Sequence, residues 1–204
     1  MSKLLGSKTF KISCSAAFAA LSAIMTALPL SLPYPIIPYL KFDPSEIPVL
    51  TAFLVFGTWP GITSAITLWI ILNIFGSWVP IGPAMKFAAI TSMLMGVWIG
   101  SGFKNSPMEA FNSKIRGILA FILGTIMRII VMGIFNYIIV WLICPFFLDI
   151  ALKSITATTG LTINNNVDAL IWVMTFTAIF NTLHTILTII PSLTIAKIIR
   201  KIIS

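Results

Sequence analysis

Long apolar stretches with almost no charge are the feature that most limits what this chain can fold into. Of its 204 residues, 58% are hydrophobic and only 9% are charged, whereas about 25% of the residues in a typical soluble domain carry a charge. A soluble domain near this size still exposes roughly 30% of its unfolded-chain surface to water. So few polar groups cannot cover such a surface, and the composition predicts that lipid is the solvent for most of the protein.

Six stretches of the chain are apolar enough to form membrane helices, each of which needs about 20 mostly apolar residues to cross a bilayer. Proline, glycine and clusters of polar residues separate them, and these residues end helices. We expect an all-α membrane protein with six transmembrane helices, forming a single integral membrane domain over residues 1–204. The expected helices cover approximately residues 11–28, 43–57, 62–78, 83–100, 115–143 and 168–198.

The second expected helix is the shortest and has an N-terminal signature. Asp43 is expected to be its N-cap, Pro44 its first helical residue, and Glu46 the acid that completes a capping box. The Gly-Thr-Trp-Pro-Gly sequence at 57–61 predicts a tight turn into the third helix. Residues 145–168 are expected to form a polar connecting stretch.

The basic residues are distributed unequally between the two sides that this count defines. With six spans, both termini lie on one side, and that side collects Lys3, Lys8, Lys11, Lys104, Lys114, Arg116, Lys197, Arg200 and Lys201. The other side receives Lys41 and Lys153, together with Asp43, Glu46, Asp149 and Asp168. Because cytoplasmic loops carry an excess of lysine and arginine, we expect a multi-pass protein of the plasma membrane with both termini cytoplasmic. The net charge of +8 is therefore interpreted as membrane topology, and no nucleic-acid partner is expected.

Two basic residues, Lys86 and Arg128, fall inside the expected spans. A cation at the centre of a membrane helix costs about 2.5 to 3.5 kcal/mol on insertion scales, so it should face the protein interior, pair, or extend to the interface. Lys86 lies one turn from the outer end of its helix, where it can either be solvated or reach a ligand. Arg128 is near mid-span, which predicts an interior polar contact. Cys14 and Cys144 lie near opposite ends of different spans, and we expect both to be free thiols.

Polar side chains form stripes along the last two expected helices. Asparagine in hydrocarbon is costly without a hydrogen-bond partner, so these faces should point inward, either toward each other or toward a polar ligand. Helical spacing places the following residues on common faces: Thr177, Asn181, His184 and Thr188 on the last helix, and Arg128, Met132 and Asn136 on the helix before it.

Two further features lie near the N-terminus. Ala16 and Ala20, continued by Ala23 and Ala27, form a small-residue stripe that lets another helix approach closely; internal packing explains the stripe equally well. The proline-rich segment at 29–43 is more apolar than a solvated connection should be, which predicts a lid over the helix bundle, with a rigid surface loop as the alternative.

Catalytic and nucleotide-binding motifs give no support for an enzyme. Gly6-Ser7-Lys8-Thr9 lacks the upstream glycine and the strand of a phosphate-binding loop, so the chain is not expected to hydrolyse ATP. Its single histidine, His184, has no acid near it in the same helix, so local spacing cannot build a catalytic or zinc site. A small intramembrane enzyme and a stand-alone channel remain alternatives, although a charged ring or a filter-like repeat is missing.

Several of these segments resemble one family of membrane proteins. The sequence at 39–48 (YLKFDPSEIP), followed by 56–61 (FGTWPG), resembles the loop and second helix of the substrate-binding S components of energy-coupling factor (ECF) transporters. The Arg-x3-Met-x3-Asn-Tyr sequence at 128–137, with Phe180-Asn181, is similar to the riboflavin-specific RibU type. The resemblance covers most of the chain in order.

The resemblance implies a vitamin-capture subunit with six helices and a cavity open to the outside. It implies riboflavin as the transported ligand, no cofactor and no metal, and ligand contacts from Tyr39, Leu40, Phe42, Lys86, Asn136, Asn181 and His184. It further implies that Ala16 and Ala20 dock onto a membrane scaffold subunit, the T component, which carries two cytoplasmic ATPases.

The chain also departs from the family pattern at two positions. His184 stands where a lysine usually follows the last-helix asparagine, and Lys86 stands in the place of an asparagine that usually lies near the start of the fourth helix. A basic residue on the fourth helix in place of the one on the sixth would still provide a hydrogen-bond donor for a flavin. The same departures also allow another vitamin or precursor, such as pantothenate or a flavin nucleotide (FMN).

Overall fold

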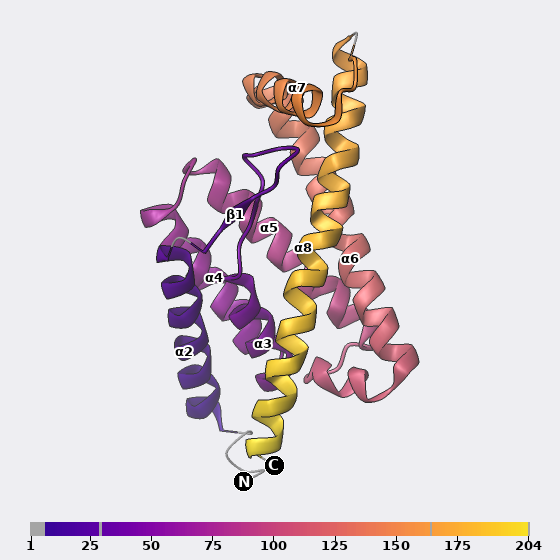
Figure 1. The fold of residues 1–204 in the computed structure, drawn as a ribbon. Helices are drawn as coiled ribbons and strands as arrows, with labels where there is room; N and C mark the ends of the chain where they lie inside the picture. Colours follow the sequence, from indigo (N-terminus) through magenta and orange to yellow (C-terminus); the bar gives the residue numbers. More distant parts are fainter. Residues whose placement is uncertain (1–6, 29, 164, 204) are drawn as a thin grey trace.

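The computed structural model describes residues 7–28, 30–163 and 165–203, and the described chain is almost entirely helical (Figure 1). Two short strands and a few irregular turns connect the helices. In chain order the elements are α2 (Lys8–Ala27), β1 (Leu32–Pro33), β2 (Lys41–Phe42), α3 (Glu46–Phe56), α4 (Thr58–Phe75), α5 (Ile81–Gly100), the 3₁₀ turn η1 (Pro107–Asn112), α6 (Lys114–Tyr137), the π-helical turn η2 (Ile138–Ile143), α7 (Phe146–Thr159) and α8 (Asn166–Ile203).

Among the described residues, five helices are long and apolar enough to cross a membrane: α2, α4, α5, α6 continued by η2, and α8. The remaining expected span, 43–57, corresponds to α3, which has only 11 residues. At 1.5 Å per residue α3 is about 17 Å long, roughly half the hydrocarbon thickness of a bilayer. Most of α3 is buried within the bundle, so it behaves as an interior helix. The count of six membrane-crossing helices stays a prediction.

Several local predictions around α3 differ from the structure, in which the helix begins at Glu46 and not at Pro44. Ser45, not Asp43, is at the N-cap, and the Asp43 Oδ1 atom accepts a hydrogen bond from the Ser45 backbone N–H at 2.8 Å. The side chain of Glu46 turns into the protein core, where it is 1% exposed, so the acid does not form a capping box. The expected turn at 57–61 is shorter than predicted, because Gly57 alone separates α3 from α4 and adopts a φ of 107° that favours glycine.

The stretch expected to be a polar connection contains a helix, α7, which lies beside the start of α8 in Figure 1. Its buried residues, Phe147, Leu148, Ala151 and Ile155, recur at helical spacing. Gly160 ends the helix in the left-handed conformation, with a φ of 72°. The prediction missed α7 because its 14 residues are too few for a membrane span and its sequence mixes apolar with polar residues.

The segment between α2 and α3, residues 30–45, is called the cover loop below. Its two strands pair antiparallel, with Leu32 opposite Phe42 and Pro33 opposite Lys41. Tyr34 and Ile37 are buried, at 6% and 0% exposure, and pack in a core cluster with residues of α7 and α8. The expectation that this segment folds back over the bundle is confirmed.

The start of α2 and the end of α8 lie at the same end of the molecule, opposite α7 (Figure 1). At that end, side-chain contacts connect α8 and α3 through the segment before η1. Arg200 Nη2 donates to Ser106 Oγ at 2.6 Å, and Ser106 Oγ donates to the Leu54 carbonyl oxygen at 3.3 Å. The basic residues expected on one side thus gather near one end, except that Lys3 lies outside the described residues. Cys14 and Cys144 are both free, as expected.

The closest helix packing in the bundle is between α5 and α6, and it depends on small residues. A Cβ atom added at Gly96 would overlap the carbonyl oxygen of Leu123, and one added at Gly100 would overlap the backbone of Ala120. Small residues of this kind let two membrane helices approach until their backbones touch. This contact fixes the position of α6, which carries Arg128 and Asn136.

We predict that Gly96→Ala lowers the thermal stability of the detergent-purified protein, because the added methyl group has no room against the α6 backbone. Overpacking of this kind typically costs about 1–3 kcal/mol. The matched control is Gly133→Ala on α6, where the nearest atom to an added Cβ is Met174 Cε at 3.7 Å. A Gly96→Ala variant as stable as the Gly133→Ala variant would contradict the close-packing account.

Candidate ligand-binding site

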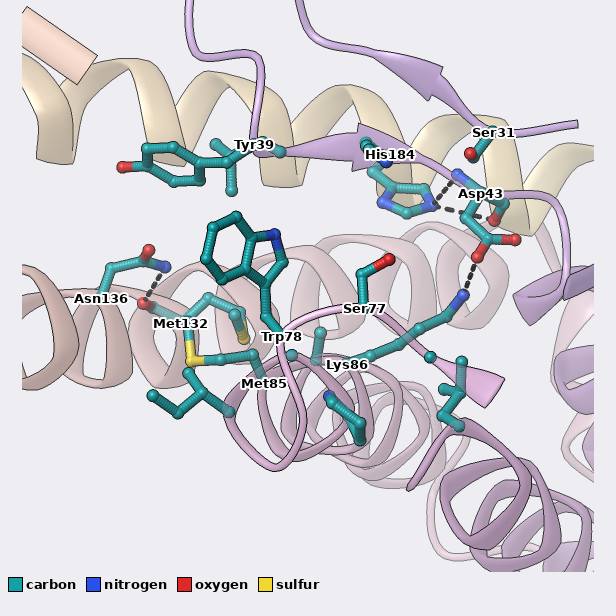
Figure 2. A pocket seen from close by; sticks show the side chains of 18 of the residues that line it. Ser31, Tyr39, Asp43, Ser77, Trp78, Met85, Lys86, Met132, Asn136 and His184 are labelled. Atoms are coloured by element: carbon teal, nitrogen blue, oxygen red, sulfur yellow. Dashed lines mark hydrogen bonds and ion pairs between the residues drawn. The ribbon is translucent and has the colours of Figure 1, made fainter. Parts of the chain in front are cut away.

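A cavity of about 310 Å³ lies beneath the cover loop. Its walls come from α5, α6, α8, the cover loop and the connection at 76–78 between α4 and α5. Ligand pockets in proteins usually measure about 300–1,000 Å³, so the cavity can hold a small molecule. Figure 2 shows its side chains converging from several elements, with Tyr39 and His184 on one side and Asn136, Met132 and Lys86 on the other.

Six of the seven residues expected at a ligand site line this cavity: Tyr39, Leu40, Lys86, Asn136, Asn181 and His184. Phe42 is not among the lining residues. Its ring packs against the rings of Phe180 and His184, at centroid distances of 4.8 and 5.7 Å. Phe42 therefore supports one wall of the cavity from behind.

Both predicted polar stripes face inward. The four residues Thr177, Asn181, His184 and Thr188 are 1–4% exposed, and Arg128, Met132 and Asn136 are 1–6% exposed. The arrangement of α6 against α8 brings the two stripes together, and Arg128 makes the contact between them. Tyr137, the residue after Asn136, is 42% exposed and faces away.

Arg128 is the centre of a buried polar network. Its Nη1 donates to Glu46 Oε2 at 2.6 Å and its Nη2 donates to Glu46 Oε1 at 3.0 Å, which is the bidentate geometry of a strong guanidinium–carboxylate pair. Its Nε donates to Asn181 Oδ1 at 3.1 Å. The predicted interior contact of Arg128 is confirmed, but Glu46, which was expected on the outer side as a capping acid, is instead buried as its partner.

His184 extends this network to the cover loop. Arg128 Nη2 lies 3.0 Å from His184 Nδ1, and since arginine has only donors, Nδ1 must accept. The neutral ring then carries its hydrogen on Nε2, which donates to the Asp43 carbonyl oxygen at 3.2 Å. Arg128 is therefore neutralised by Glu46, and a neutral His184 links it to the chain just before α3.

The two asparagines expected to contact a ligand differ in how many hydrogen bonds they already make. Asn181 accepts from Arg128 and donates from Nδ2 to the Thr177 carbonyl oxygen at 2.9 Å. Asn136 donates to the Met132 carbonyl oxygen at 2.8 Å, which leaves its side-chain oxygen available to the cavity (Figure 2). The geometry thus assigns Asn181 chiefly to holding Arg128 and makes Asn136 the better placed of the two for a ligand.

Tyr39 supplies a polar group that has no partner. Its hydroxyl oxygen is buried and makes no hydrogen bond within the described part of the chain, although buried hydroxyl groups are normally paired. Burial raises the pKa of Tyr39 well above its ordinary value, so the group stays a neutral donor and acceptor. Tyr39 lies across the cavity from Asn136 (Figure 2).

Lys86 has an interior partner instead of extending to solvent. Its ammonium contacts the carboxylate of Asp43 and lies 2.7 Å from Ser45 Oγ. The sequence prediction left open whether this lysine is solvated or reaches a ligand, and the structure shows a third arrangement, an ion pair with the cover loop.

Trp78 and Met85 also line the cavity, together with Phe147 of α7, and sequence reasoning missed all three. Trp78 sits near the opening with 57% exposure, and its ring packs edge-on against Phe147 at a centroid distance of 5.1 Å. The only sequence signal for Trp78 as a site residue was its position between Gly76 and Pro80, in the connection between two helices. These side chains make the remaining cavity wall largely apolar and aromatic.

The fold and the sequence both have known counterparts. The model of the family "ECF transporter, substrate-specific component" matches residues 11–196, and the chain belongs to this family, whose members are transporter components and not enzymes. A solved structure of the S component of a bacterial ECF transporter superposes with a TM-score of 0.68 over 97% of this chain and 99% of that chain, at 20% sequence identity.

A curated relative is the riboflavin transporter RibU of Staphylococcus aureus (strain TCH60), which is 30% identical over 119 residues. The match spans 58% of this chain and 59% of the length of that protein, so it covers less than two thirds of either. The described chain is thus a membrane-embedded transporter component with several apolar helices.

We predict that Glu46→Gln strongly destabilises the protein, because it leaves the Arg128 guanidinium buried without a counter-charge. Breaking a buried pair in this way typically costs about 3–5 kcal/mol, measurable as a fall in melting temperature in detergent. The control is Glu109→Gln, which removes an exposed carboxylate 3.0 Å from Lys104 and should cost less than about 1 kcal/mol. Equal stability of the two variants would contradict the central role of the Arg128–Glu46 pair.

Proposed function

We propose that this chain is the substrate-capture subunit of an ECF-type vitamin transporter and that it binds riboflavin from outside the cell. The single observation that carries the proposal is the cavity beneath the cover loop, in which apolar aromatic walls face two groups with free hydrogen-bonding capacity, the Tyr39 hydroxyl and the Asn136 side-chain oxygen. An isoalloxazine ring is planar and largely apolar with a polar edge, which suits such a cavity. The resemblance to a riboflavin transporter over part of the chain supports the same ligand.

The charges in the cavity support a neutral ligand over the alternatives pantothenate and FMN, which are anionic. Arg128 is paired with Glu46, and Lys86 is paired with Asp43. Lys41, the other lining cation, is exposed to solvent at the rim. A carboxylate or phosphate inside the cavity would have to displace a protein carboxylate, and this costs free energy that riboflavin does not require.

For energy the chain would depend on partner subunits, namely a T component in the membrane and two cytoplasmic ATPases. We place both termini in the cytoplasm of the cell whose plasma membrane holds the protein, because the basic residues gather at that end of the bundle. The cavity then faces the outside. Ala16 and Ala20 of α2 are exposed, on a helix at the edge of the bundle (Figure 1), and this position is suited to docking onto the T component.

We predict that the detergent-purified chain binds riboflavin, seen as quenching of flavin fluorescence on titration, and that Asn136→Ala weakens the affinity roughly 5- to 150-fold. The factor corresponds to about 1–3 kcal/mol for leaving a buried polar group of the ligand unpaired. Asn73→Ala is the matched control, because Asn73 also donates to the carbonyl four residues earlier, at 2.8 Å, but does not line the cavity. Tighter binding of pantothenate or FMN than of riboflavin would contradict the assigned ligand.

We further predict that replacing Ala16 and Ala20 together by tryptophan blocks co-purification with a co-expressed T component and its ATPases, while riboflavin affinity stays unchanged. Bulky rings on the small-residue stripe would hold the partner helix away. Ile126→Trp, at an exposed position of α6, controls for the added bulk. Assembly that survives the double substitution would assign the stripe to some other role.

A further inference from the structure

The ion pair between Lys86 and Asp43 joins α5 to the cover loop beside the cavity. The Lys86 ammonium contacts the Asp43 carboxylate and the Ser45 hydroxyl together, and Figure 2 shows the lysine side chain extended along the cavity wall to Asp43. The two side chains of the ion pair are only 16% and 17% exposed. Water therefore screens this pair less than it screens an ordinary surface salt bridge.

Asp43 occupies the point where the cover loop enters the bundle. It directly follows β2, two residues separate it from the start of α3, and its backbone carbonyl accepts from His184. Three residues of the cover loop that line the cavity, 39–41, come immediately before Phe42 and Asp43. A displacement of Asp43 would therefore be transmitted through Phe42 alone to the part of the loop that covers the ligand.

The bonds that Lys86 already makes argue against a direct contact with the ligand. An ammonium group has three donors, and two of them are directed at Asp43 and Ser45. A ligand that bound Lys86 directly would have to compete with a carboxylate. The pair is better suited to hold one wall of the cavity against another.

We propose that Lys86 is a positioning residue that holds the cover loop over the cavity through Asp43 and thereby slows the escape of bound ligand. This inference rests on the proposed function for the identity of the ligand. The attachment of the cover loop by Lys86 is independent of the proposed function, because it is a property of the protein without ligand. No contact between Lys86 and the ligand is needed.

The kinetic test measures riboflavin dissociation by stopped-flow fluorescence after a chase. Lys86→Met, which keeps an unbranched side chain and removes its charge, should speed dissociation by roughly tenfold or more, since tenfold is close to the lower limit for hydrogen bonds to charged groups. The association rate should change less, because the open loop leaves access to the cavity unobstructed. An unchanged dissociation rate would overturn the proposal.

A double-substitution cycle separates positioning from direct ligand contact. If Lys86 acts only through Asp43, then Asp43→Asn should speed dissociation about as much as Lys86→Met, and the double variant should be no faster than either single variant. If Lys86 instead binds the ligand, Asp43→Asn should free its ammonium and leave binding unchanged or tighter. The second pattern would overturn the proposal even though Lys86→Met weakens binding.

A third experiment measures the attachment of the cover loop in the protein without ligand. Backbone hydrogen exchange over residues 30–43 should be faster in Lys86→Met than in the unaltered chain, while exchange in α5 and α6 is unchanged. Lys104→Met is the matched control, since Lys104 forms an exposed pair with Glu109 at 3.0 Å and should alter neither exchange in the cover loop nor dissociation. Equal exchange of the loop in all three proteins would overturn the proposal.

The two proposals fail in different ways. If the unaltered chain binds no riboflavin, the proposed function fails, and the hydrogen-exchange comparison alone decides whether Lys86 holds the cover loop. If riboflavin binds but neither its dissociation nor loop exchange responds to Lys86→Met, the function stands and the role given to Lys86 fails.

Discussion

A guanidinium group buried inside a membrane domain has to be neutralised, and much of this structure follows from how the chain neutralises Arg128. The side chain of Arg128 is 1% exposed and lies near the middle of α6. Its counter-charge, Glu46, is at the first residue of α3, so α3 must begin at the depth of Arg128. This explains why α3 is short, and why the cover loop has to pass into the bundle before the helix starts (Figure 1).

The same network shapes the cavity. Asn181 and His184 both hold Arg128 from α8, and His184 also contacts the backbone of Asp43. Because these groups satisfy one another, the deep polar wall of the cavity is neutral and hydrogen-bonded within itself. Direct recognition of a ligand is then left to groups with free hydrogen-bonding capacity, Tyr39 and Asn136, and to the aromatic side chains around them. A preformed neutral wall also lowers the ordering cost of binding.

Much of the architecture could be predicted from the sequence because lipid imposes simple rules. Apolar length located the long helices, and the cost of unpaired polar groups predicted that Asn136, Asn181 and His184 face inward. Helix α7 escaped prediction because 14 residues with mixed polarity match neither a membrane span nor a polar loop. The site was predicted less completely, since six of its residues were named from the resemblance to a family but the partners of those residues were not.

Glu46 shows why the partners could not be predicted. In the sequence it stands three residues after Asp43, where a capping box explains it locally, and Arg128 lies 82 residues further along the chain. Local spacing carries no information about a contact that only the tertiary fold creates, when it brings the start of α3 to the side chain of Arg128 on α6. The Lys86–Asp43 pair, separated by 43 residues, was missed for the same reason.

The central claim is that this neutral cavity encloses a flavin beneath the cover loop while the Arg128–Glu46 pair stays intact. An experimental structure of the purified chain with riboflavin tests it most directly. The account predicts density for the ligand between Tyr39, Trp78 and Asn136, with Arg128 still bound to Glu46. Riboflavin located elsewhere, or Arg128 released from Glu46 to contact it, would contradict the account.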